Sequence, residues 1–286
     1  MKFSFKPEFK AIPVGGNSQF HVLTSFSVPA SSGISGIQRT PISIALVIDC
    51  SGSMQGAKLD QTINAILEIT HSLTRRDRLA IVAFDTNVKV ISELKYLTEK
   101  SEVAEKVRTI TAGSSTNLSG GWLEGLDQLE SAFDTDHINR VFLLTDGQAN
   151  CGITEAGELA RIGSTFLGKG ISTSTFGFGN DFNESLLSAI ARNSGGNFYF
   201  VQRAEDVSTA FRNEFGEVLD LAGQNCKIFL ELAEGVELCE DISLFSSTRN
   251  GNLVTWTVGD INSELDYELI FRLNATVDND LKKLKL

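Results

Sequence analysis

The chain has 286 residues, 42% hydrophobic and 21% charged, with a formal net charge of −11, which fits a globular protein of one or two domains and argues against a nucleic-acid partner. No apolar run approaches the ~18 residues that a membrane-spanning helix needs, and the first eight residues lack the apolar core of a signal peptide. We therefore expect no membrane span and a location in the cytoplasm.

The chain begins with two stretches that alternate between polar and apolar residues. Lys2–Pro13 and Ser18–Val28 predict two strands joined by a turn, and a loop of small residues leads on to residue 39. Two strands alone are marginally stable, so residues 1–39 need partners from elsewhere in the chain.

Strands and helices then alternate from residue 40 to residue 222. Ile44–Ile48 is apolar at every position, which is typical of a strand that helices cover on both faces. The alternation predicts a doubly wound, mostly parallel α/β sheet with one hairpin at Asp85–Asn87. The predicted strands are Ile44–Ile48, Arg78–Phe84, Val88–Leu94, Arg140–Leu144, Ile171–Phe178 and Asn197–Val201. The predicted helices are Lys58–Leu73, Thr98–Ile110, a helix that follows Ala112–Gly121 and reaches Phe133, Thr154–Leu167, Phe182–Asn193 and Ala204–Leu221.

Residues 223–277 change back to short alternating strands. They predict an antiparallel β module, which we expect to pair with residues 1–39 in one composite β-sandwich flanking the α/β domain. Residues 278–286 are interpreted as a tail or linker. The predicted strands of this module are Lys227–Leu232, Val236–Leu238, Ile242–Phe245, Leu253–Val258 and Tyr267–Leu273.

Oxygen-bearing side chains follow two of the buried strands. Asp49, Ser51 and Ser53 come directly after the central strand, where a buried carboxylate is costly unless something compensates it. Asp146 ends a second apolar strand, and Thr116 lies in a loop of small residues. In an open α/β sheet, ligands bind beyond the carboxyl ends of strands where the strand order reverses. We therefore expect these five residues to converge on one metal site.

The chemistry of this ligand set indicates which ion it would hold. Hydroxyl and carboxylate oxygens suit a hard cation, and the low total charge leaves coordination positions for water or an incoming group. This favours Mg²⁺ or Mn²⁺ over Ca²⁺, which prefers a cage richer in carboxylates.

Asp49-x-Ser51-x-Ser53, the distant Thr116 and Thr145-Asp146-Gly147 together resemble the metal-ion-dependent adhesion site of von Willebrand factor type A domains. The resemblance covers roughly residues 41–221, and residues 49–59 are similar to bacterial and inter-alpha-trypsin-inhibitor heavy-chain-like members, which also carry flanking β-strands. It implies a bacterial, non-catalytic interaction module. The two aspartates and three hydroxyls would hold a divalent ion that binds a Glu or Asp carboxylate of a protein partner.

Several alternatives stay open. Asp49 with the two serines could instead cap the helix that begins near Gly56, and Asp146 with Gly147 could form only a turn. Cys50 and Cys151 each lie close to a predicted acidic ligand, so they could form a redox pair.

Other functions compete with the binding module. The chain could be a co-chaperone or substrate-delivery subunit of a larger ATPase, or a hydrolase that uses the ion to activate water. It has no phosphate-binding loop, no G-x-S-x-G elbow and only three histidines, so we do not expect an enzyme.

Overall fold

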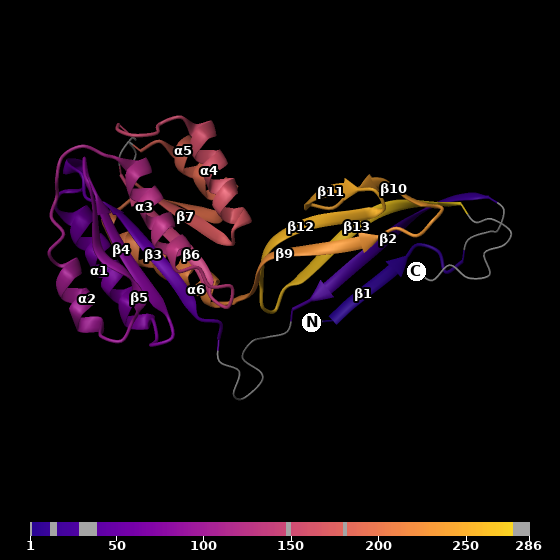
Figure 1. Cartoon of the computed structure of the whole chain (residues 1–286), viewed down its shortest axis with the longest axis horizontal. Helices are drawn as coiled ribbons and strands as arrows, with labels where there is room; N and C mark the ends of the chain where they lie inside the picture. Colours follow the sequence, from indigo (N-terminus) through magenta and orange to yellow (C-terminus); the bar gives the residue numbers. More distant parts are fainter. Residues whose placement is uncertain (1, 12–15, 29–38, 147–149, 180–181, 277–286) are drawn as a thin grey trace. The chain divides into compact units, whose positions relative to one another are not determined.

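The structure is a computed structural model that describes residues 2–11, 16–28, 39–146, 150–179 and 182–276. The chain divides into two compact units, one made of residues 38–219 and one made of residues 1–37 with 220–286 (Figure 1). The predicted loop 29–39 and the Asp146-Gly147 turn lie partly outside the described residues, and the predicted tail 278–286 lies wholly outside them. No helix within the described ranges is both long and apolar enough to cross a membrane.

The unit of residues 38–219 is built on a six-stranded sheet. The strand order is β5-β4-β3-β6-β7-β8, and every neighbouring pair is parallel except β4 and β5, which form the predicted antiparallel hairpin. The predicted doubly wound, mostly parallel α/β fold is therefore confirmed. The strands are β3 (Ile42–Asp49), β4 (Arg78–Phe84), β5 (Val88–Tyr96), β6 (Ile138–Thr145), β7 (Ile171–Phe178) and β8 (Gly195–Val201).

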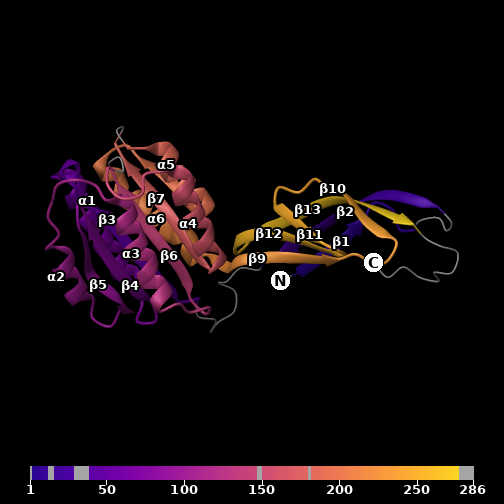
Figure 2. The same cartoon turned by 45° about the horizontal axis from the view of Figure 1, so that its top comes forward.

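Helices cover both faces of this sheet (Figure 1). As a consequence β3, β4, β6 and β7 are buried at every position. On one face α3, α4 and α5 pack on alternate strand residues such as Val47 and Val141. On the other face Phe211 of α6 packs against Phe142 and Phe176, and α1 lies beside α6 (Figures 1 and 2). The helices are α1 (Ala57–Ser72), α2 (Lys100–Val107), α3 (Leu118–Ser131), α4 (Ala156–Gly168), α5 (Glu184–Asn193) and α6 (Val207–Leu219), with short 3₁₀ turns η2 (Gly52–Met54) and η3 (Ala204–Asp206).

Helix α3 lies unusually close to the central strands. A Cβ at Gly125 would be only 2.3 Å from Val47 Cγ2, and a Cβ at Gly121 would be 2.3 Å from Phe84 Cδ1. The two glycines therefore allow α3 to rest directly on β3 and β4. This contact fixes the start of α3, which follows the Thr116 loop.

Asp77 lies at the end of the sheet where β3 and β4 begin, and it stabilises the chain there. Its buried carboxylate accepts hydrogen bonds from Arg39 Nη1 (2.9 Å) and Nη2 (2.5 Å), from the Ile42 N–H (2.9 Å), and from the N–H (2.6 Å) and hydroxyl (2.8 Å) of Thr74. Burial alone would raise the pKa of Asp77, but these hydrogen bonds outweigh burial and hold the pKa below its usual range. Asp77 is thus a structural acid.

The second unit consists of two antiparallel sheets, with orders β1-β2-β13-β10 and β11-β12-β9. Strands from both chain ends share the first sheet, since β13 pairs with β2 along its whole length. The core between the sheets includes Phe20 and Trp256. The strands are β1 (Lys2–Pro7), β2 (Asn17–Ser27), β9 (Leu221–Glu231), β10 (Val236–Asp241), β11 (Ser246–Asn250), β12 (Leu253–Asn262) and β13 (Asp266–Thr276).

One strand prediction in this unit is wrong. Ile242–Phe245 connects β10 to β11 and is not a strand, whereas the polar segment Ser246–Asn250 is one. The Asp241 carboxylate accepts hydrogen bonds from the Ser243 N–H (3.0 Å) and the Ser247 hydroxyl (2.5 Å), which bends the chain after β10. As a result Leu244 is 99% exposed, although an apolar residue in an alternating stretch usually indicates a buried position.

Candidate metal centre

The two strands that end in predicted acidic ligands are neighbours. In the parallel register of β3 and β6, Ile48 lies opposite Leu144, so Asp49 and Asp146 extend from the same edge of the sheet. The chain runs from β3 to β4 on one side, whereas β6 lies on the other side, so the strand order reverses between them. This is the position at which open α/β sheets bind ligands.

Asp49 is held in a fixed orientation at this edge. Its Oδ1 accepts a hydrogen bond from the Ser51 N–H at 2.7 Å, and its Oδ2 accepts one from the Thr145 hydroxyl at 2.5 Å. Burial raises the pKa of Asp49 although these hydrogen bonds lower it, and the nearby charge of Asp146 adds to the rise. Two acids this close in a buried setting favour a bound cation.

Asp146 joins the same group through side chains. Its Oδ1 accepts a hydrogen bond from the Ser53 hydroxyl at 2.6 Å, and the Ser53 and Ser51 hydroxyls are hydrogen-bonded to each other at 3.1 Å. The ammonium of Lys58, near the start of α1, forms an ion pair with Asp146 Oδ2. Four of the five predicted ligands thus belong to one connected group, and a cationic group already contacts it.

Thr116 is positioned by the backbone. The loop before it bonds to the Asp49 loop, since the Gly52 N–H donates to the Ser114 carbonyl at 2.9 Å and the Gly113 N–H donates to the Cys50 carbonyl at 2.6 Å. Thr116 is 3% exposed, and within the described ranges its hydroxyl joins none of the hydrogen bonds among the other ligands. Its loop therefore lies against the site, whereas its role as a ligand stays a prediction.

The donor set fits a hard divalent ion. The converging groups are carboxylate and hydroxyl oxygens, which are the donors that Mg²⁺ and Mn²⁺ prefer. Among the residues that the structure describes, no group of three or more His, Cys, Asp or Glu side chains is arranged to hold a metal. An ion at this edge would therefore depend on the serine hydroxyls as well as on the two acids.

The helix-cap interpretation of Asp49 and the serines is wrong. Helix α1 begins at Ala57 with Gly56 as its N-cap, and no side chain caps it. Gly56 has a φ of +85°, a conformation that favours glycine. The Asp49 loop therefore does not serve to start this helix.

The thiol beside Asp49 is poorly suited to redox chemistry. Cys50 and Cys151 are both free, and the Cys50 thiol is buried and donates to the Phe84 carbonyl at 3.3 Å. Burial and the charges of Asp85 and Asp49 raise the pKa of Cys50 to about 11. The thiolate that disulfide exchange requires is therefore scarce at neutral pH.

Sequence reasoning did not single out Lys58 and Thr145 as site residues. Lys58 follows the predicted ligands by five positions at the start of an amphipathic helix, where an exposed lysine is ordinary. Thr145 precedes Asp146 and is fully buried, and its hydroxyl bonds to Asp49. Thr145 is a polar residue at the buried end of an apolar strand, and this position in the sequence could have indicated that its hydroxyl needs a partner.

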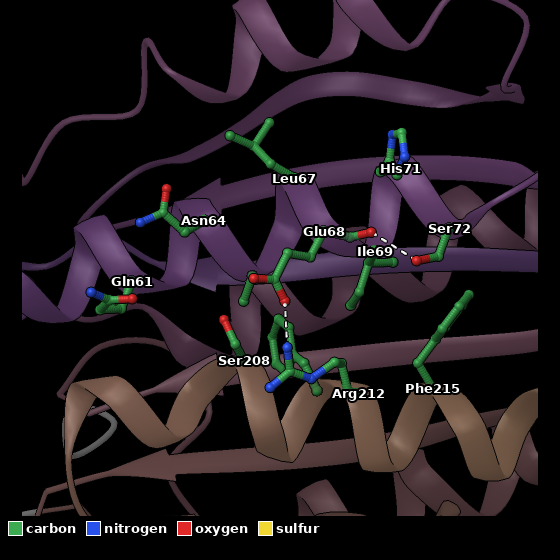
Figure 3. Close-up of a pocket in the computed structure, with 12 residues that line it drawn as sticks. Gln61, Asn64, Leu67, Glu68, Ile69, His71, Ser72, Ser208, Arg212 and Phe215 are labelled. Atoms are coloured by element: carbon green, nitrogen blue, oxygen red, sulfur yellow. Dashed lines mark hydrogen bonds and ion pairs between the residues drawn. The ribbon is translucent and has the colours of Figure 1, made fainter.

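A separate pocket of about 670 Å³ lies between α1 and α6 and contains none of the predicted ligands (Figure 3). Glu68 of α1 and Arg212 of α6 form an ion pair across it at 3.5 Å. Both side chains are largely exposed, so the pair adds little stability. The candidate chemistry lies at the sheet edge and not in this pocket.

Comparison with known sequences gives a family match within the α/β unit and several related proteins. A family model, the von Willebrand factor type A domain, matches residues 43–213. The chain is 27% identical over 201 residues to an uncharacterized protein of Synechocystis sp., which covers 70% of this chain and 47% of that protein. It is 30% identical over 193 residues to inter-alpha-trypsin inhibitor heavy chain H3 of Rattus norvegicus, 64% of this chain and 22% of that protein. The chain thus spans less than half the length of these relatives.

Solved structures share the fold. A von Willebrand factor type A protein from Catenulispora acidiphila superposes with a TM-score of 0.72 at 19% identity, over 99% of this chain and 67% of that one. Proximal thread matrix protein 1 from the mussel byssus, described with a zinc-occupied metal-ion-dependent adhesion site, superposes with a TM-score of 0.51 at 20% identity, over 68% of this chain and 50% of that one. At these identities the likeness shows the fold alone.

Proposed function

The chain belongs to the von Willebrand factor type A domain family, and we propose that it is a metal-ion-dependent interaction module that binds an acidic residue of a protein partner. The observation that carries this proposal is the connected group of Asp49, Ser51, Ser53 and Asp146 at the strand-order reversal. The group offers hard oxygen donors at a rim where Ser53 is exposed to solvent.

Each residue has a distinct part in this proposal. Asp49 and Asp146 would hold the ion directly or through water, and Ser51, Ser53 and Thr116 would supply hydroxyl oxygens. A divalent ion bound by only two carboxylates retains affinity for a third anionic oxygen, which the partner's Glu or Asp would provide. Thr145 orients Asp49, and the short loop of η2 brings Ser51 and Ser53 to the same side.

We propose Mg²⁺ or Mn²⁺ as the resident ion because of the few carboxylates and the hydroxyl donors. The mussel byssus protein is described with zinc at such a site, so Zn²⁺ belongs in the test. Location in a bacterial cytoplasm stays a prediction from the sequence.

Binding is favoured over hydrolysis because, among the described residues, no histidine is hydrogen-bonded to the group of predicted ligands. His137 lies at the other end of the sheet, where its Nδ1 is 3.0 Å from the hydroxyl of Ser43 at the start of β3. Burial lowers the pKa of His137, with the charge of Arg78 acting in the same direction. A role as a co-chaperone or delivery subunit of a larger ATPase is compatible with a binding module.

Metal titration and capture test the proposal. We expect calorimetry to show one divalent-ion site that Asp146→Asn weakens at least tenfold, whereas Asp136→Asn, an exposed acid before β6, leaves it unchanged. Partners retained on the immobilised chain with Mg²⁺ should be released by chelator, and neutralising one acidic residue of such a partner should abolish its retention. Capture that is equal in chelator contradicts the proposal. Phosphoester turnover that disappears in Asp49→Ala would indicate a hydrolase instead.

A further inference from the structure

Within the described residues the two sheets of the β-sandwich have four free edges, and three of these edges carry features that discourage further strand pairing. Strand β1 carries Lys2, Lys6 and Pro7, β10 is rich in acids and irregular between Leu238 and Glu240, and β11 is entirely polar. Lysine, proline and irregular register are the usual devices that protect sheet edges. Strand β9 carries Lys227 but no proline, and its register with β12 is regular from Lys227 to Glu231, where it presents Phe229.

The free edge of β9 has unpaired backbone groups around Phe229. The Leu232 N–H donates to the Asn252 carbonyl at 2.8 Å, which sets the alternation of the β9–β12 ladder. By this alternation the N–H and C=O groups of Lys227, Phe229 and Glu231 point away from β12. Within the described residues these groups face no further strand, and the Phe229 side chain is 62% exposed.

An apolar groove lies beside this edge. Phe3 and Phe5 of β1 lie opposite Phe26 and Thr24 of β2, both buried, and therefore face the inside of the sandwich. They are nevertheless 59% and 37% exposed. The groove has a volume of about 60 Å³ and is lined by residues of β1 and β9 together with residues of β2, β12 and β13.

The groove arises because the two sheets of the sandwich differ in their number of described strands. Three strands face four, and the core cluster places Ile228 and Leu230 of β9 with Phe20 and Val22 of β2. Strand β1 lies beyond β2, so no strand of the other sheet that the structure describes covers it. One strand added to β9 at the usual spacing of about 4.8 Å would cover Phe3 and Phe5.

The charges along the edge define what such a strand would carry. Lys227 and Glu231 flank Phe229 on the outer face, two residues away on either side. Lys2 lies toward the Lys227 end, because Phe3 stacks on Phe26, which packs in one cluster with Cys226. An acid opposite Lys227 and a base opposite Glu231 would be cross-strand charge pairs, each contributing roughly 0.2–1 kcal/mol.

From these features we infer that the β9 edge binds an extended segment of a protein partner as an added antiparallel strand. Inward-facing and outward-facing side chains alternate along the segment, and two valine-sized apolar side chains enter the groove over Phe3 and Phe5. Its outward side chains run from a base opposite Glu231, through an aromatic residue opposite Phe229, to an acid opposite Lys227. Backbone hydrogen bonds supply affinity, and the groove and charges supply specificity. This site is separate from the metal centre and needs no ion.

Fluorescence anisotropy with a labelled ten-residue peptide tests the inference on the full chain. The peptide has the central sequence Lys-Val-Tyr-Val-Glu, and the matched probe has the same composition with the two charges exchanged. We expect the first peptide to bind at least threefold more tightly than the second, and chelator to have no effect. The Lys227→Glu/Glu231→Lys double variant should invert this preference, whereas Glu237→Lys on β10 should leave it unchanged.

Phe229→Pro provides a second variant, because it removes an N–H that faces the free edge and spares the bonds to β12. We expect at least tenfold weaker binding with an unchanged circular dichroism spectrum. Equal binding of the two peptides, or no inversion in the double variant, overturns the inference. Binding that appears only after deletion of residues 277–286 also overturns it, since this chain would then fill the groove itself.

Discussion

Replacing Lys58 with methionine should raise the affinity of the candidate centre for a divalent ion. The Lys58 ammonium pairs with Asp146 Oδ2, so an ion that approaches Asp146 meets both a positive charge and a competitor for the same oxygen. Methionine keeps a long apolar side chain on the helix and removes the charge. The change therefore isolates the electrostatic contribution of the ammonium.

The magnitude follows from the charges and the exposure of the side chain. An ammonium and a divalent ion roughly 5 Å apart in a water-like dielectric repel each other by about 1.7 kcal/mol. Because Lys58 is 37% exposed, its ammonium can turn toward solvent and reduce this penalty. We expect a net gain of about 1 kcal/mol, which corresponds to a roughly fivefold lower Kd.

Isothermal titration calorimetry with Mg²⁺ and with Mn²⁺ at pH 7 measures this difference. Lys106→Met is the matched control, because Lys106 is 42% exposed and pairs with Glu102 on α2. The control should bind the ion as the wild type does. An unchanged or weaker affinity in Lys58→Met would refute the reasoning and would mean that Lys58 supports the ion-binding geometry.

Three further predictions concern stability and reactivity. Asp77→Asn should lower the free energy of unfolding by about 2 kcal/mol at pH 7. Folding lowers the pKa of Asp77, so the contribution of its carboxylate to stability is present above pH 3.8 and is lost as the pH falls further. The free energies of unfolding of the two proteins, measured by denaturant titration, should therefore converge as the pH falls below 3.8. Gly125→Ala should lower the melting temperature through its clash with Val47, with about 1–2 kcal/mol lost, whereas Gly216→Ala in α6, where a Cβ meets nothing within 4 Å, should not. Cys50, with a pKa of about 11, should react with a thiol reagent at pH 8 far more slowly in the folded than in the urea-denatured protein, and equal rates would contradict its burial.

The sequence predicts the α/β unit well because its signal is redundant. The segments Ile44–Ile48 and Val141–Leu144 are apolar throughout, and an acid follows each of them within two residues. The fold class and the predicted position of the ligands therefore follow from the same residues. Neighbouring strand ends then follow from the topology of the fold. The convergence of Asp49 and Asp146 could thus be predicted without any contact information.

Other contacts depend on side-chain geometry that no local pattern encodes. Lys58 has an ordinary position on an amphipathic helix, and only the three-dimensional path of η2 and α1 brings it to Asp146. Leu244 shows the opposite failure, since an apolar residue in an alternating stretch is almost fully exposed. The uncovered faces of Phe3 and Phe5 likewise arise from the number of strands in the facing sheet, which the alternation of β1 itself does not determine.

The two acids of the candidate centre differ in the groups that hydrogen-bond to them. This difference indicates which of these groups a binding ion would displace. Asp49 is bound by a backbone N–H and by the fully buried hydroxyl of Thr145, neither of which can leave without disturbing β3 or β6. Asp146 is bound by Ser53, which is exposed, and by Lys58, which is partly exposed. Those two partners can turn away at the cost of side-chain motion alone. Asp49 therefore provides the fixed part of the site, and the partners of Asp146 are the ones that an arriving ion would displace.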